Sequence, residues 1–123
     1  MADIILVEDD ATIGRSYAEA LRMSDHDVRL AESAEVLETE LQKAVPDLLL
    51  LLDIGLPGFD GLDILRRLRL DPRKTELKVA VLSNHTDRSI VHDALSLGIV
   101  EYVERASITP SLLPGQVRRW LER

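Results

Sequence analysis

This chain contains the stretch Leu48-Leu49-Leu50-Leu51-Leu52-Asp53, five leucines followed by a carboxylate. A second apolar run, Ile4-Ile5-Leu6-Val7, is also followed by acids, Asp9 and Asp10. Apolar runs of this length, bounded by polar residues, indicate strands that are buried on both faces of a parallel sheet. Because the ends of parallel strands share one edge of the sheet, we expect the three aspartates to lie close together.

Carboxylates that are crowded together repel one another, so such a cluster needs a cation. Oxygen ligands of this kind suit Mg²⁺. Taken alone, the pair Asp9–Asp10 would fit the N-terminus of a helix equally well. A carboxylate directly after five leucines, however, is costly without a partner, and Asp53 therefore favours the metal site.

The composition limits the class of protein. The 123 residues fit one domain, 46% of them are hydrophobic, and there is no cysteine for disulfides or thiolate chemistry. The net charge of −7 argues against nucleic-acid binding through a basic face. The N-terminus does not resemble a secretory signal, and no apolar run reaches membrane-spanning length. We therefore expect a soluble, cytoplasmic protein that does not bind membranes.

The rest of the chain alternates between strand and helix patterns. We expect strands at residues 4–7, 27–31, 48–52, 77–82 and 100–103. Helices are expected at 11–23, 33–43, 60–70 and 87–97, followed by an irregularly started helix that carries Leu113, Val117, Trp120 and Leu121. Ser33 is a predicted N-cap, Pro46 a helix stop and Gly98 a C-cap. Five strand–helix units predict an α/β fold, a five-stranded parallel sheet with helices on both faces.

Four segments resemble the receiver domain of response regulators, and the resemblance covers the whole chain. They are the first-strand motif Leu6-Val7-Glu8-Asp9-Asp10, the phosphoacceptor loop Leu52-Asp53-Ile54-Gly55-Leu56-Pro57-Gly58-Phe59-Asp60-Gly61, the strand end Val81-Leu82-Ser83 and the approach to the last strand, Gly98 through Tyr102. The resemblance implies a single receiver domain over residues 1–123, with a flavodoxin-like fold and strand order 2-1-3-4-5.

The resemblance also assigns roles. Asp53 would be the nucleophile that takes a phosphoryl group as an acyl phosphate. Mg²⁺ would be bound by Asp10, Asp53 and the backbone carbonyl of Gly55, with Asp9 acting directly or through water. Such a domain is not an enzyme in the ordinary sense, because it catalyses only its own phosphorylation and dephosphorylation.

Three further residues receive roles in the switch. Ser83 would hydrogen bond a phosphoryl oxygen, Arg105 would bind the phosphoryl group, and Tyr102 would be the aromatic switch of the output face. Taken alone, Ser83 and Arg105 indicate little, since serine is common at strand ends and arginine in surface ion pairs. His85 is expected in solvent, although its place two residues after Ser83 would let it overhang the site.

The sequence departs from the family pattern at three places. Arg105 stands where the family has Lys, often followed by a cis-forming Pro that is missing here, and its planar fork is longer. Asn84 replaces the usual small Ala and would crowd the phosphorylated aspartate. The family has four residues between the positions of Asp47 and Asp53, whereas this chain has five leucines. We expect the extra leucine before the strand or in a bulge, because an extra residue within the strand would move every side chain to the opposite face of the sheet.

The expected function is that of a phosphoacceptor in a two-component phosphorelay, fed by a histidine kinase or a phosphotransfer protein and acting on an unknown output partner. The family also allows a homodimer through the last strand and its flanking helices. Arg105 and Asn84 support an alternative, a pseudo-receiver that binds proteins without phosphorylation. A metal-dependent phosphohydrolase with an aspartyl phosphate is a weaker alternative, because Gly55 occupies the position where those enzymes carry their acid.

Overall fold

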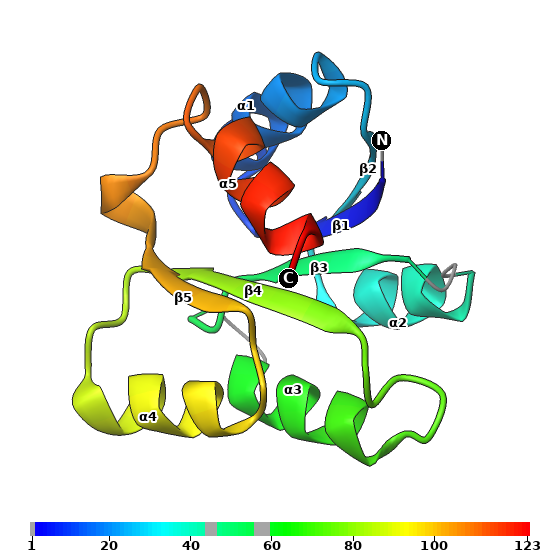
Figure 1. Ribbon diagram of the computed structural model, residues 1–123, viewed down its shortest axis with the longest axis vertical. Coiled ribbons are helices and arrows are strands. Elements are labelled where there is room, and N and C mark those ends of the chain that lie inside the picture. The colour runs from blue at the N-terminus through cyan, green and yellow to red at the C-terminus, as the bar shows by residue number, and fades with distance from the viewer. Residues whose placement is uncertain (1, 44–46, 56–59) are drawn as a thin grey trace.

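A parallel five-stranded sheet separates two layers of helices (Figure 1). The structure is a computed structural model that describes residues 2–43, 47–55 and 60–123. The strands are β1 (Asp3–Val7), β2 (Asp27–Ala31), β3 (Leu49–Leu52), β4 (Lys78–Ser83) and β5 (Glu101–Glu104). They lie in the order β2-β1-β3-β4-β5, and every neighbouring pair is parallel. The predicted fold class and strand order are therefore confirmed.

Within the described residues, five helices connect the strands or follow them. They are α1 (Ala11–Arg22), α2 (Ala34–Gln42), α3 (Gly61–Leu70), α4 (Arg88–Ser96) and α5 (Leu113–Leu121), with a short 3₁₀ turn, η1 (Arg105–Ser107), before α5. Ser33 caps α2 through a hydrogen bond to Val36 N, as predicted. Gly98 has φ +75° just after α4, which agrees with its predicted place at a helix end. Among the described residues, no helix is both long enough and apolar enough to span a bilayer.

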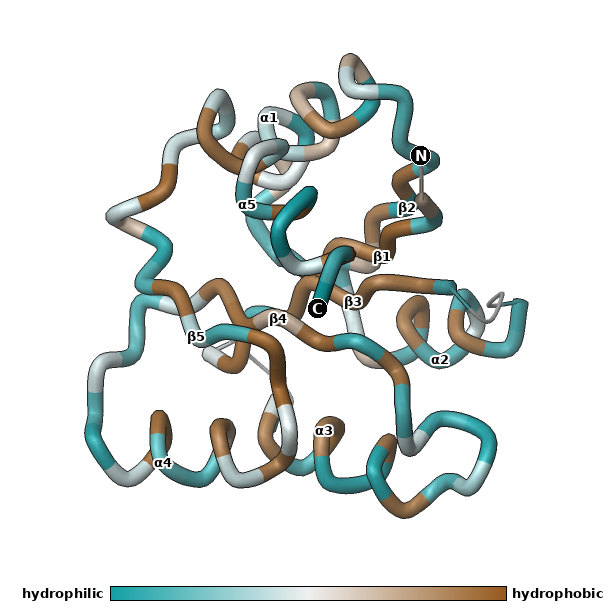
Figure 2. The backbone as a smooth tube through the Cα atoms, in the orientation of Figure 1, coloured by the Kyte–Doolittle hydropathy of each residue, from teal (hydrophilic) through white to brown (hydrophobic). Residues whose placement is uncertain are grey.

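The two faces of the sheet carry separate apolar clusters. α1 and α5 cover one face, where Tyr17, Leu21, Val117 and Trp120 pack on the strands. α2, α3 and α4 cover the other face (Figure 1). The brown, hydrophobic stretches in Figure 2 follow the strands and the inner sides of the helices. The low aromatic content explains why leucine, isoleucine, valine and alanine fill most of both clusters.

The leucine run lies in the middle of the sheet. Leu49 and Leu51 point to the cluster under α1 and α5, whereas Leu48, Leu50 and Leu52 point to the opposite cluster, and all five are buried. The paired residues of β1 and β3 run from Ile4 with Leu49 to Val7 with Leu52 without a bulge. The extra leucine is therefore Leu48, which precedes β3, and the register of the strand is kept.

Two sequence predictions fall outside the described residues. These are the helix stop at Pro46 and the middle of the phosphoacceptor loop, Leu56 through Phe59. The late start predicted for the last helix is confirmed, because α5 begins at Leu113 after η1 and Leu112 provides no side-chain cap. The other element boundaries lie within two residues of the prediction.

Candidate functional site

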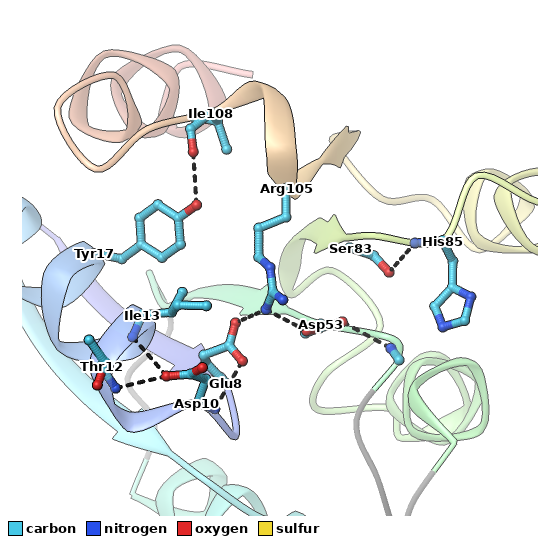
Figure 3. Close-up of polar contacts among 11 residues, drawn as sticks. Glu8, Asp10, Thr12, Ile13, Tyr17, Asp53, Ser83, His85, Arg105 and Ile108 are labelled. Carbon is cyan, nitrogen blue, oxygen red and sulfur yellow. Dashed lines mark hydrogen bonds and ion pairs between the residues drawn. The ribbon is translucent and has the colours of Figure 1, made fainter.

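Three carboxylates meet at the edge of the sheet where β1 and β3 end. Figure 3 shows two of them, Glu8 and Asp53. Glu8 and Asp9 follow β1, and Asp53 follows β3. One oxygen from each of the three side chains lies within 4.8 Å of the others. Glu8 and Asp53 are 3% and 7% exposed, whereas Asp9 is open to solvent. Because all these donors are oxygen atoms, the cluster fits a hard cation such as Mg²⁺.

The register of the two strands explains this meeting. Val7 of β1 pairs with Leu52 of β3, so the next residues, Glu8 and Asp53, emerge side by side. Side chains alternate between the two faces of a strand. Glu8 continues the face of Ile4 and Leu6, and Asp53 continues that of Leu49 and Leu51, which is the face that α1 and α5 cover.

Asp10 lies beside the cluster, with its carboxylate turned to α1. Its Oδ1 accepts hydrogen bonds from Thr12 N at 2.9 Å and Ile13 N at 3.1 Å, so that it caps the helix. Its own N–H donates to Glu8 Oε2 at 3.1 Å. The described acidic cluster thus contains Glu8, which the sequence analysis did not select, while the role of Asp10 as a metal ligand stays a prediction.

Arg105 places a guanidinium between two of the acids. Its Nη1 donates to Asp53 Oδ2 at 3.1 Å and also hydrogen bonds Glu8 Oε1. Burial lowers the pKa of Arg105, but the hydrogen bond with Glu8 and the charges of Glu8 and Asp53 outweigh it and raise that pKa. Burial raises the pKa of Glu8, opposed by the hydrogen bond from Asp10 N and by Arg105. The two buried acids therefore have an internal counter-ion.

The second oxygen of Asp53 binds the backbone that follows it. Asp53 Oδ1 accepts a hydrogen bond from Gly55 N at 2.9 Å. A Cβ atom added to Gly55 would lie 2.5 Å from His85 Nε2, so the imidazole lies directly against this glycine. His85 is exposed, as the sequence predicts. It also borders the site, which its place two residues after Ser83 allowed.

Ser83 and Tyr102 lie on the neighbouring strands. Ser83 ends β4, is fully buried, and accepts a hydrogen bond from His85 N at 3.2 Å through its Oγ. The hydroxyl of Tyr102 donates to the carbonyl oxygen of His85 at 2.6 Å, and burial raises the pKa of this phenol. Asn84 is exposed. The strand ends therefore bring Ser83 and Arg105 to the edge where Asp53 lies, as Figure 3 shows.

Comparison with known proteins places the chain in a family. The family model for the response regulator receiver domain matches residues 4–113. The transcriptional activator protein ExaE of Pseudomonas putida is 34% identical over 120 residues, which is 96% of this chain and 54% of that protein. This chain belongs to the family of response regulator receiver domains. It spans about half the length of the curated relatives that head the comparison.

Solved structures agree with this assignment. The BeF3-activated receiver domain of DrrB superposes with a TM-score of 0.83 at 27% identity, covering 100% of this chain and 99% of that one. The Mn²⁺-bound form of the response regulator Rcp1 superposes with a TM-score of 0.82 at 26% identity, covering 98% of this chain and 94% of that one. The relatives are named as regulators of response or transcription.

Proposed function

We propose that this receiver domain, over residues 1–123, is a phosphorylation switch in which Asp53 accepts a phosphoryl group in a Mg²⁺-dependent reaction. One observation carries the proposal. The Asp53 carboxylate is buried, yet it lies at the edge of the sheet beside Glu8 and Asp9, with a guanidinium nitrogen 3.1 Å from one of its oxygens. A carboxylate in this position has both a site for a metal and a cation for the phosphoryl group.

The reaction we propose forms one bond and breaks one. A carboxylate oxygen of Asp53 bonds to the phosphorus of a phosphohistidine, and the P–N bond breaks with its electron pair going to the imidazole, which takes a proton from solvent. The donor would be a histidine kinase or a phosphotransfer protein, which implies a cytoplasmic location for this domain. The product is an acyl phosphate on Asp53, so the chain acts only on itself.

The metal would be held by Glu8, Asp9, Asp53 and the backbone carbonyl of Gly55, and Asp10 could add a ligand through water. When bound, Mg²⁺ neutralises charge on the phosphoryl oxygens. The similar structure of Rcp1 is named as a Mn²⁺-bound form, which supports a divalent cation at a site of this kind. The all-oxygen donor set of this chain supports the same class of ion.

Ser83 and Arg105 would stabilise the phosphorylated state. Ser83 accepts the hydrogen bond from His85 N, so its hydroxyl proton remains for another acceptor, and we assign it to a phosphoryl oxygen. On phosphorylation, Arg105 would release Glu8 and bind the phosphoryl group instead. Because Arg105 follows β5, this exchange would move the loop after β5, and Tyr102 would report the change to an output partner that binds the surface of α4, β5 and α5. We propose this surface for a homodimer as well.

The experiment is intact mass after incubation with phosphoramidate and Mg²⁺. We expect one added phosphoryl group in the wild type, none in Asp53→Asn, and strong dependence on the metal. An unchanged mass of the wild type under forcing conditions would contradict the proposal. It would favour the pseudo-receiver, for which the ion pairs of Arg105 with Glu8 and Asp53 are the supporting observation, because they offset part of the charge of both acids.

A further inference from the structure

The loop after β5 is attached to the rest of the domain at two points three residues apart. At one end Arg105 binds Glu8 and Asp53. At the other end the carbonyl oxygen of Ile108 accepts a hydrogen bond from the hydroxyl of Tyr17, on α1, at 2.8 Å (Figure 3). Tyr17 and Ile108 are each 5% exposed, so this bond is buried.

Hydrogen bonds within the loop connect these two points, so that a shift at one of them moves the other. Residues Arg105–Ser107 form the 3₁₀ turn η1, and Ile108 N donates to Arg105 O at 3.2 Å. Ser107 Oγ donates to Glu104 O at 2.7 Å and closes the turn on the other side. The residue directly after Arg105 is Ala106 rather than proline, so these hydrogen bonds, and not a proline ring, hold the backbone there. A fixed carbonyl at Ile108 therefore fixes the backbone of Arg105.

Tyr17 also lies in the electrostatic surroundings of the site. Burial raises the pKa of Tyr17, while the charge of Arg105 lowers it and that of Glu8 raises it. A tyrosine hydroxyl is protonated at neutral pH even at its ordinary pKa, so Tyr17 can donate to a carbonyl. A buried carbonyl without a donor is unfavourable, so the loop prefers the position in which Tyr17 reaches Ile108.

We propose that Tyr17 is a positioning residue for Arg105. Its hydrogen bond to the Ile108 carbonyl holds the β5–α5 loop in the position where Arg105 binds Glu8 and Asp53. Through this contact, α1 sets how strongly Arg105 competes with Mg²⁺ for the two acids. This inference rests on the proposed function, because the cation that competes is the one proposed for Asp53. The carboxylates that would bind the metal are the same ones that bind the guanidinium.

The test is the Mg²⁺ dissociation constant of the full chain, measured by calorimetry for wild type, Tyr17→Phe and Ser16→Ala. Tyr17→Phe keeps the ring and removes only the hydroxyl. We expect about two- to tenfold tighter Mg²⁺ binding, since one hydrogen bond of ordinary net strength then no longer favours the competing ion pair. Ser16→Ala is the control, because it removes an exposed hydroxyl on the same helix that donates to Thr12 O at 3.0 Å. It should leave the constant unchanged.

A double substitution separates positioning from a general structural effect. In an Arg105→Ala background there is no guanidinium to position, so Tyr17→Phe should no longer change Mg²⁺ affinity. The proposal is overturned if Tyr17→Phe binds Mg²⁺ as the wild type does, or if its effect is the same without Arg105. It is also overturned if neither wild type nor Tyr17→Phe binds Mg²⁺.

A measurement on the wild type covers the case in which Tyr17→Phe does not fold. During a Mg²⁺ titration, the carbonyl ¹³C resonance of Ile108 and the ring resonances of Tyr17 should shift together with those of Glu8 and Asp53. Shifts confined to the acids would overturn the proposal. The mass experiment is independent of these measurements. A wild type that binds Mg²⁺ but takes no phosphoryl group would contradict the proposed function, while the role of Tyr17 in Mg²⁺ affinity would stand.

Discussion

Substitutions at Asp9 and Asp10 should have opposite effects, although the two residues are adjacent and carry the same charge. The Asp9 carboxylate lies within 4.8 Å of oxygens of Glu8 and Asp53, whereas Oδ1 of Asp10 accepts two N–H groups at the start of α1. Asp9→Asn should therefore relieve repulsion and weaken metal binding. Asp10→Ala should remove a helix cap, and Asp10→Asn should keep it, because asparagine caps helices as well as aspartate does.

The magnitudes follow from these contacts. Two unit charges 4.8 Å apart repel by about 0.9 kcal/mol at the dielectric constant of water. Asp9 is exposed and Arg105 offsets part of the charge of its neighbours, so we expect Asp9→Asn to raise the free energy of unfolding in EDTA by about 1 kcal/mol. Asp10→Ala should lower it by about 1 kcal/mol. For a domain of 123 residues, each change corresponds to about 4 °C in Tm.

Thermal unfolding followed by circular dichroism, in EDTA and in Mg²⁺, measures both effects. At ten times the dissociation constant, Mg²⁺ should stabilise the wild type by about 1.4 kcal/mol, which is about 5 °C. Asp10→Ala and Asp10→Asn should keep most of this gain, and Asp9→Asn should lose most of it. If Asp10→Asn loses the gain as completely as Asp9→Asn does, the assignment of Asp10 as a cap beside the metal site is refuted.

Three further predictions test other contacts. Arg105→Lys should leave transfer from a small phosphodonor nearly intact and change the conformational response, read by NMR shifts around Tyr102; an unchanged response in both Arg105→Lys and Arg105→Ala would make Arg105 a surface residue. Gly61→Ala should destabilise by about 1–3 kcal/mol in urea unfolding, because its Cβ would lie 2.6 Å from the backbone of Ile54, next to Asp53. Gly55→Ala is the matched control. Its Cβ would lie close only to the movable imidazole of His85 and in ordinary van der Waals contact with Asp53 Oδ1, so an equal loss would disprove the backbone clash. Burial lowers the pKa of His26, whose Nδ1 accepts a hydrogen bond from Ala2 N at 3.1 Å. The contribution of this histidine to the free energy of unfolding is therefore present above its ordinary pKa of 6.5. It should be lost as the pH drops from 6.5 toward the lower pKa of His26 in the folded protein. His26→Asn should flatten this slope in urea titrations at pH 7.5 and 5.5, and an equal slope would exclude His26 as its source.

The fold could be predicted because most of its determinants are local. Each strand is a short apolar run bounded by polar residues, and the leucine run kept its register because the extra residue, Leu48, precedes β3. Ser33 and Gly98 act at helix ends through their own side chain and backbone, so the sequence indicates them directly. The start of α5 was less defined because Leu112 offers no capping side chain.

The acids of the site were harder to select. The sequence predicts that carboxylates meet at the ends of β1 and β3, and the cluster around Asp53 agrees with that expectation. The choice between Glu8 and Asp10 depends on where β1 ends and α1 begins, and on the pairing of Val7 with Leu52. Boundary and register are set by packing across the sheet. The available signal was the alternation along β1, which places Glu8 on the face of Ile4 and Leu6.

Two of the crowded carboxylates, Glu8 and Asp53, have a cationic partner within the described part of the chain, the guanidinium of Arg105. Its contact with Glu8 spans 97 residues of sequence and its contact with Asp53 spans 52, so no local pattern could have indicated either. Since Glu8 and Asp53 are already paired, a metal does not simply relieve their repulsion. A metal bound by these acids would compete with a guanidinium that, in our proposal, α1 holds in place through Tyr17 and Ile108. The affinity for Mg²⁺ would then be set as much by the loop that carries Arg105 as by the acids themselves.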